Sequence, residues 1–124
     1  MRETSVQSET RSHIEQLKSP AGDAVAVLRL EGDIASTSKD AVLGAYQSLP
    51  KESNPLILLD FTKVDYINSS GIALVIQLLM EASTAGQKIS ICGLSPHFNK
   101  VFTMVGIPKY ATLFPTHAEA LAAL

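Results

Sequence analysis

Two adjacent serines, Ser69 and Ser70, are the residues of this sequence best placed for regulated chemistry. They follow Asn68, lie a few residues beyond a continuous apolar run, and precede an apolar stretch with helical spacing. In open α/β sheets, functional groups gather in the loops that leave the carboxyl ends of the strands. We expect this loop to be one of them, with Ser69 at or beside the N-cap of the following helix.

Phosphorylation of Ser69 is the chemistry that this position favours. A phosphate there would carry about −1.5 to −2 charges at neutral pH and would face the unpaired N–H groups and the positive end of the helix. The fold would therefore tolerate the modification. A partner surface packed against the neutral hydroxyl would instead meet a desolvated double charge, so we expect binding to switch off without unfolding.

A simpler interpretation remains open for the same loop. Asn68, Ser69 and Ser70 are all good N-cap residues and could serve only to start the helix. Gly71, which follows them, is expected to be small enough to let a partner approach the backbone closely.

The helix after the serines has more apolar residues than one face requires. One set recurs with helical spacing and is expected to face the core: Ile72, Val75, Ile76 and Leu79. A second set projects elsewhere: Leu74, Leu78 and Met80. Either neighbouring helices cover this second set, or it forms an apolar patch beside the serines that binds a partner protein.

The sequence lacks the motifs of common enzyme classes. There is no Gly-x-Ser-x-Gly elbow, since the nearest string, residues 93–97, contains Pro and ends in His, and there is no Gly-rich Walker loop. The histidines, His13, His97 and His117, are too separated for a metal motif, and Cys92 is expected to be a buried thiol in the wrong place to assist them. We therefore expect a protein that is not an enzyme and has neither metal nor cofactor.

The composition fits one globular domain with a core of its own. The chain has 124 residues, of which 46% are hydrophobic and 18% charged. A net charge of −2 with dispersed basic residues argues against nucleic acid and anionic membranes as partners. The longest apolar runs, such as residues 72–76, are too short for membrane insertion, and a single cysteine allows no internal disulfide. We expect a cytoplasmic protein.

The order of elements predicts an α/β fold. Residues 1–12 are expected to be a flexible tail and residues 13–124 a single domain. A turn at residues 19–23 predicts a hairpin, although the first strand, near Ile14, also fits a helical turn. The later elements expected are a helix from about residue 36 to Pro50, a buried central strand at 56–61, a loop at 62–68, a helix at about 69–85, a strand at 88–92, a helix from Pro96 to Gly106 and a short helix to Leu124. Together they predict a mixed sheet of four to five strands with about four helices packed on it.

Residues 64–73, Val-Asp-Tyr-Ile-Asn-Ser-Ser-Gly-Ile-Ala, preceded by Leu-Asp-Phe at 59–61, resemble the signature of the STAS domain of bacterial anti-sigma-factor antagonists. The resemblance covers most of the chain, from Ile14 to Leu124. It includes Leu-Glu-Gly-Asp-Ile at 30–34, the strand region at 86–93 and the segment at 101–107. These motifs in this order are far more specific than the serine pair alone.

The resemblance implies partner switching. In this family the unmodified antagonist binds an anti-sigma factor that is also a serine kinase, which releases the sigma factor. Phosphorylation of the first serine of the motif, here Ser69, ends that binding, and a metal-dependent serine phosphatase restores it. The partner-binding residues expected are Asp33, Asn68, Ser69, Ser70, Gly71, Ile72, Leu74 and Leu78. The other partner considered is a second copy of the chain, in a weak homodimer.

Two positions depart from the pattern of the family. Asn68 and Ala35 stand where members commonly carry acidic residues. This departure favours another role of STAS domains, that of a regulatory subunit of an ABC transporter that docks on its ATPase, whereas the intact serine pair favours the switch. A scaffold role in a stress-signalling complex ranks third, because such members usually carry an altered motif.

Overall fold

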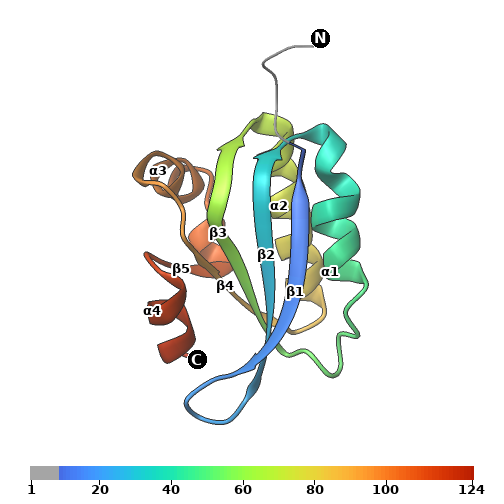
Figure 1. Cartoon of the computed structure of the whole chain (residues 1–124), viewed down its shortest axis with the longest axis vertical. Coiled ribbons are helices and arrows are strands. Elements are labelled where there is room, and N and C mark those ends of the chain that lie inside the picture. The colour runs from blue at the N-terminus through green and yellow to red at the C-terminus, as the bar shows by residue number, and fades with distance from the viewer. Residues whose placement is uncertain (1–8) are drawn as a thin grey trace.

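The computed structural model describes residues 9–124, so residues 1–8 of the expected tail lie outside the described residues. Within residues 9–124, five strands form one sheet in the order β1-β2-β3-β4-β5 (Figure 1). They are β1 (Arg11–Lys18), β2 (Ala24–Ile34), β3 (Leu56–Ile67), β4 (Lys88–Cys92) and β5 (Ala111–Phe114). The pair β1/β2 is antiparallel and the other neighbouring pairs are parallel. The predicted mixed sheet is confirmed.

The helices of the described chain connect and cover these strands. They are α1 (Ala45–Gln47), α2 (Ser69–Thr84), α3 (Pro96–Met104) and α4 (His117–Ala122). A 3-10 turn (Ser36–Ser38) and a π-helical turn (Asp40–Gly44) precede α1, and a further 3-10 turn (Ile107–Lys109) precedes β5. Residues 36–47 are thus one helical segment of mixed geometry, in the place where the sequence predicts an amphipathic helix.

The two faces of the sheet are covered unequally. The main core lies between one face and the helices α2, α3 and 36–47, where Leu28 and Leu59 of the sheet share a cluster with Tyr46, Val75 and Phe102. On the opposite face α4 covers a smaller apolar cluster of Val25, Val27, Leu58, Cys92 and Ala120 (Figure 1). Residues 57–61 of β3 are buried on both faces, which explains their continuous apolar run.

β3 is longer than the apolar run predicts. Residues 62–67, expected in a loop, continue the strand, because residues 63–67 pair in parallel with residues 31–34 of β2 across register shifts. The extension brings the two strand ends together, and the N–H of Asn68 donates to the carbonyl of Ile34 at 3.1 Å. The start of α2 is therefore held at the end of β2.

The two edge strands complete the sheet. β1 pairs antiparallel with β2, which confirms the predicted hairpin over the helical turn. It begins at Arg11, so residues 11 and 12, expected in the tail, belong to the sheet. β5, which the sequence pattern does not locate, is four residues long and pairs with β4. Both edges depend on pairing with a neighbour more than on a strong local pattern.

Candidate functional site

The first turn of α2 shows which residue caps the helix. Asn68 is the N-cap, and its Oδ1 accepts a hydrogen bond from the N–H of Gly71 at 2.8 Å. Its carbonyl accepts from the N–H of Ile72 at 2.9 Å. Ser69 and Ser70 are exposed first-turn residues, and within the described part of the chain neither hydroxyl makes a hydrogen bond. Capping therefore does not require Ser69, which leaves its hydroxyl available for chemistry.

The electrostatics of this turn suit an anion. The N–H groups of Ser69 and Ser70 have no carbonyl of the preceding helical turn to bond, so they add to the positive end of the helix dipole. The first turn of α2 carries no acidic residue. A phosphate on Ser69 would lie beside these donors.

Asp33 and Tyr66 lie at the same end of the sheet. They are paired residues of β2 and β3. Asp33 directly precedes Ile34, whose carbonyl accepts from the N–H of Asn68, and Tyr66 is two residues before Asn68. The carbonyl of Asp33 accepts from the hydroxyl of Ser38 at 3.4 Å. Tyr66 is 53% exposed, and its ring meets that of Phe98 edge-on at 5.9 Å between centroids. Sequence reasoning includes Asp33 but misses Tyr66, whose place opposite Asp33 follows from the unexpected extension of β3.

The position of Gly71 differs from the expectation. Gly71 is buried, and a Cβ there would lie 2.2 Å from the carbonyl oxygen of Ile34 and 2.9 Å from Cγ2 of Ile67. Its small size is needed for the packing of α2 against the ends of β2 and β3. It does not open the backbone to a partner.

Leu74 and Leu78 do not form an exposed patch. Leu74 is 8% exposed and Leu78 is fully buried, whereas Ile72 is half-buried against the core. The physical reason is that α2 contacts both the sheet and the 36–47 helical segment, so apolar residues on two sides of the helix are covered. Among the three residues expected outside the core stripe, Met80 alone is exposed.

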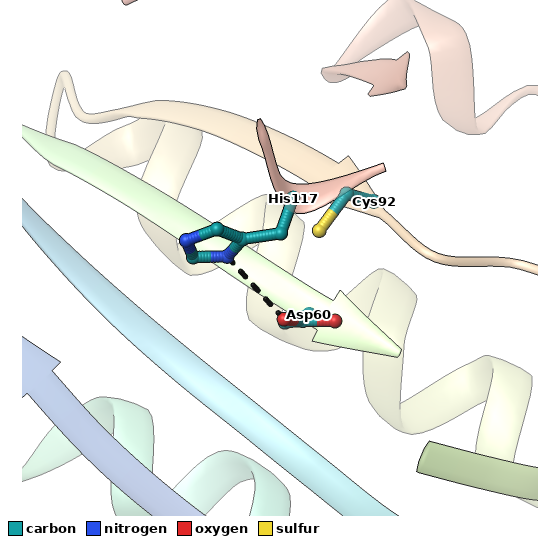
Figure 2. A group of neighbouring side chains, drawn as sticks. All are labelled: Asp60, Cys92 and His117. Carbon is teal, nitrogen blue, oxygen red and sulfur yellow. Dashed lines mark ion pairs between the residues drawn. The ribbon is translucent and has the colours of Figure 1, made fainter. Parts of the chain in front are cut away.

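A second group of polar side chains lies on the opposite face of the sheet. Asp60, Cys92 and His117 converge there from β3, β4 and the first residue of α4 (Figure 2). One ligand-type atom from each lies within 4.8 Å of the others, and Nδ1 of His117 is 3.4 Å from Oδ2 of Asp60. The expectation that Cys92 is in the wrong place to join the histidines is therefore wrong for His117.

The buried setting shifts the pKa values of this second group. Burial raises the pKa of the Cys92 thiol to about 12, and the neighbouring Asp60 charge adds to the effect. Burial also acts to raise the pKa of Asp60, but hydrogen bonds from Thr62 and the proximity of His117 outweigh it and hold that pKa below its usual value. A neutral thiol thus lies beside an ionised carboxylate, which makes Cys92 a poor nucleophile.

Removing the cap at Asn68 should destabilise the protein measurably. We expect Asn68→Ala to lower the free energy of unfolding by about 1 kcal/mol, because the N–H of Gly71 loses its acceptor. Asn68→Asp should keep full stability, since a carboxylate also accepts this bond and favours the helix dipole. Urea denaturation followed by circular dichroism measures both, with exposed Asn99→Ala in α3 as the control. A loss in Asn99→Ala equal to that in Asn68→Ala would contradict the capping role.

Comparisons with known proteins agree with this architecture. A model of the STAS domain family matches residues 13–120. This chain is 24% identical over 103 residues to a curated protein of Bordetella bronchiseptica named as the anti-sigma factor antagonist BtrV. The aligned region covers 82% of this chain and 86% of that protein.

Solved structures share the fold at low sequence identity. An anti-sigma factor antagonist from Mycobacterium paratuberculosis aligns with a TM-score of 0.76 at 19% identity and covers 93% of each chain. The phosphorylated form of the Bacillus cell fate determinant SpoIIAA aligns with a TM-score of 0.60 at 20% identity, over 88% of this chain and 95% of that chain. Among residues 9–124, no helix has the length and apolar character needed to cross a membrane.

Proposed function

Because this chain belongs to the STAS domain family, we propose that it is an anti-sigma-factor antagonist that acts as a binding module and not as an enzyme. In its unmodified form it binds an anti-sigma factor with serine kinase activity in the cytoplasm and thereby frees a sigma factor. Phosphorylation of Ser69 ends the interaction, and a serine phosphatase restores it. The names of the BtrV and Mycobacterium relatives support the partner class.

The observation that carries the proposal is that one residue at the start of α2 caps the helix and another presents the exposed hydroxyl. Asn68 supplies the capping oxygen, and Ser69 presents an exposed hydroxyl one residue later. A serine needed as a cap would lose a structural contact when modified. Ser69 has no such contact among the described residues, so its phosphorylation changes the surface charge and leaves the helix in place.

The surface that a partner would contact is narrower than the sequence predicts. Burial removes Gly71, Leu74 and Leu78 from it in the free protein. The predicted residues that remain on the contact surface are Asp33, Asn68, Ser69, Ser70 and the exposed edge of Ile72, and the structure adds Tyr66. It is small and mostly polar, so a double negative charge at its centre should weaken binding strongly.

Identification of the partner is the first experiment. Wild-type protein and Ser69→Glu serve as paired baits in a lysate of the native host, and mass spectrometry identifies what each retains. Recovery of a small ATP-binding kinase on wild type but not on Ser69→Glu supports the proposal. Recovery of transporter ATPase subunits on both baits would replace it with the ABC transporter role.

The switch itself is tested with the purified partner. We expect Ser69→Glu to weaken binding at least about tenfold, or about 1.4 kcal/mol, because its carboxylate places charge in the interface. Ser69→Ala should bind like wild type and resist phosphorylation by the partner. Ser83→Glu adds the same charge to the exposed far end of α2 and should leave affinity unchanged. Equal affinities for wild type and Ser69→Glu in calorimetry would refute the electrostatic switch.

A further inference from the structure

The structure assigns a metal site that is separate from the Ser69 surface: we propose that Asp60, Cys92 and His117 bind a zinc ion. The three residues lie far apart in the sequence, but the fold brings them together. Asp60 and Cys92 are paired neighbours in β3 and β4, and His117 begins the helix that crosses this face of the sheet. Figure 2 shows their side chains converging on one point.

The donor set suits zinc better than other common ions. Thiolate, imidazole and carboxylate are all zinc ligands, and calcium and magnesium prefer oxygen donors. Around a tetrahedral zinc ion, ligand bonds of about 2.0–2.3 Å place neighbouring ligand atoms about 3.3–3.6 Å apart. The 3.4 Å between Asp60 Oδ2 and His117 Nδ1 meets this requirement. The ligand atoms of the three residues lie within 4.8 Å of one another, so Cys92 Sγ needs a movement of at most about 1.5 Å to reach ligand distance.

The surroundings orient the carboxylate as they do in established metal sites. Oδ1 of Asp60 accepts hydrogen bonds from the backbone N–H of Thr62 at 2.9 Å and from its hydroxyl at 2.5 Å. These bonds fix the carboxylate so that Oδ2 faces His117. Such outer contacts are a regular feature of protein metal ligands.

The imidazole of His117 has a buried nitrogen that no hydrogen bond among the described residues satisfies. Nδ1 of His117 is buried and makes no hydrogen bond within the described part of the chain, since its contact with Asp60 lacks hydrogen-bond geometry. Buried polar atoms in native proteins are nearly always satisfied. A metal ion among the three side chains would use this nitrogen as a ligand.

Space for a fourth ligand is present. A pocket of about 530 Å³ borders on Asp60, Thr62 and His117 and opens toward β1 and β2. The two glutamates on its rim are already paired, as Glu15 is 2.9 Å from Arg29 and Glu31 is 3.1 Å from Arg11. Water in this pocket can complete the tetrahedron. On binding, the thiol of Cys92 releases its proton to solvent and the zinc–sulfur bond forms.

The test uses cobalt as a spectroscopic probe for zinc and the full chain freed of metal with a chelator. We expect wild type to bind one cobalt ion, with a thiolate-to-cobalt charge-transfer band and the intense visible bands of four-coordinate cobalt, and zinc to displace it. His117→Gln should weaken binding at least about tenfold, and Cys92→Ala should abolish the charge-transfer band. Exposed His97→Gln is the control and should bind like wild type.

A thermal measurement keeps the test decisive if a core variant folds poorly. Zinc should raise the Tm of wild type in a concentration-dependent way but not that of His117→Gln, which changes a half-buried side chain. Absence of the charge-transfer band in wild type would overturn the proposal. Metal binding that survives His117→Gln and is lost in His13→Gln would also overturn the proposal, because it would show adventitious binding by surface histidines only.

Discussion

Gly71→Ala should lower the free energy of unfolding by about 3 kcal/mol, the upper part of the usual range for overpacking. The added Cβ would lie 2.2 Å from the carbonyl oxygen of Ile34, which is backbone and cannot rotate away. Gly71 lies within α2, so the cost is steric and not conformational. Relief requires α2 to move away from β2, and this movement should also weaken partner binding at the neighbouring Ser69.

Gly44→Ala is the matched control for this prediction. Gly44 also has helical backbone, but the nearest atom to its added Cβ is the Cβ of Asp40 at 3.9 Å, an ordinary contact. Alanine is the better helix former, so we expect Gly44→Ala to be neutral or to stabilise the protein by about 0.5–1 kcal/mol. Chemical denaturation compares the two variants. Equal stabilities would show that α2 does not depend on the close approach at Gly71.

Gly93→Ala should be more damaging still, at about 4 kcal/mol, because it combines steric and backbone costs. Gly93 has a φ of +81°, in the left-handed region, and its Cβ would lie 2.4 Å from Oγ1 and 2.6 Å from the backbone nitrogen of Thr62. The variant would press β4 away from β3 just after their last paired residues.

Gly86→Ala is the control that separates the steric cost of Gly93→Ala from its backbone cost. Gly86 has a similar φ of +76°, but no atom lies within 4 Å of the added Cβ. Its substitution should therefore cost only about 1 kcal/mol, the conformational part. The difference in urea midpoint between the two variants then measures the contact with Thr62. If Gly86→Ala proves as unstable as Gly93→Ala, backbone conformation and not packing accounts for the loss.

The elements that the sequence predicts well are those with clear local boundaries. β4 lies at residues 88–92 as predicted, because an apolar run follows the helix-ending Gly86. α3 begins at Pro96 with Ser95 as its cap, and Thr116 caps α4 by accepting from the N–H of Glu119 at 3.1 Å. Proline, glycine and capping residues act within a few positions, so their signals can be read from one sequence.

The elements that sequence reasoning misses depend on distant parts of the chain. The second half of β3 is polar and becomes a strand because β2 pairs with it, and β5 is too short to show a pattern. The burial of Leu78 accompanies the packing of the 36–47 helical segment on α2, since Leu78 shares the core cluster with Val42 and Tyr46. Likewise, the grouping of Asp60 with Cys92 and His117 results from strand pairing and the return of α4, which no local spacing records.

The strands lie side by side in the sheet in the same order as they follow one another in the chain. Each new strand joins the free edge left by the strand before it, so no strand has to enter between two that are already paired. The β1/β2 hairpin needs only residues 11–34, and every later strand can be added as the chain leaves the ribosome from its N-terminus. Sheet assembly can thus proceed in the direction of translation, because each strand pairs with the strand immediately before it in the chain.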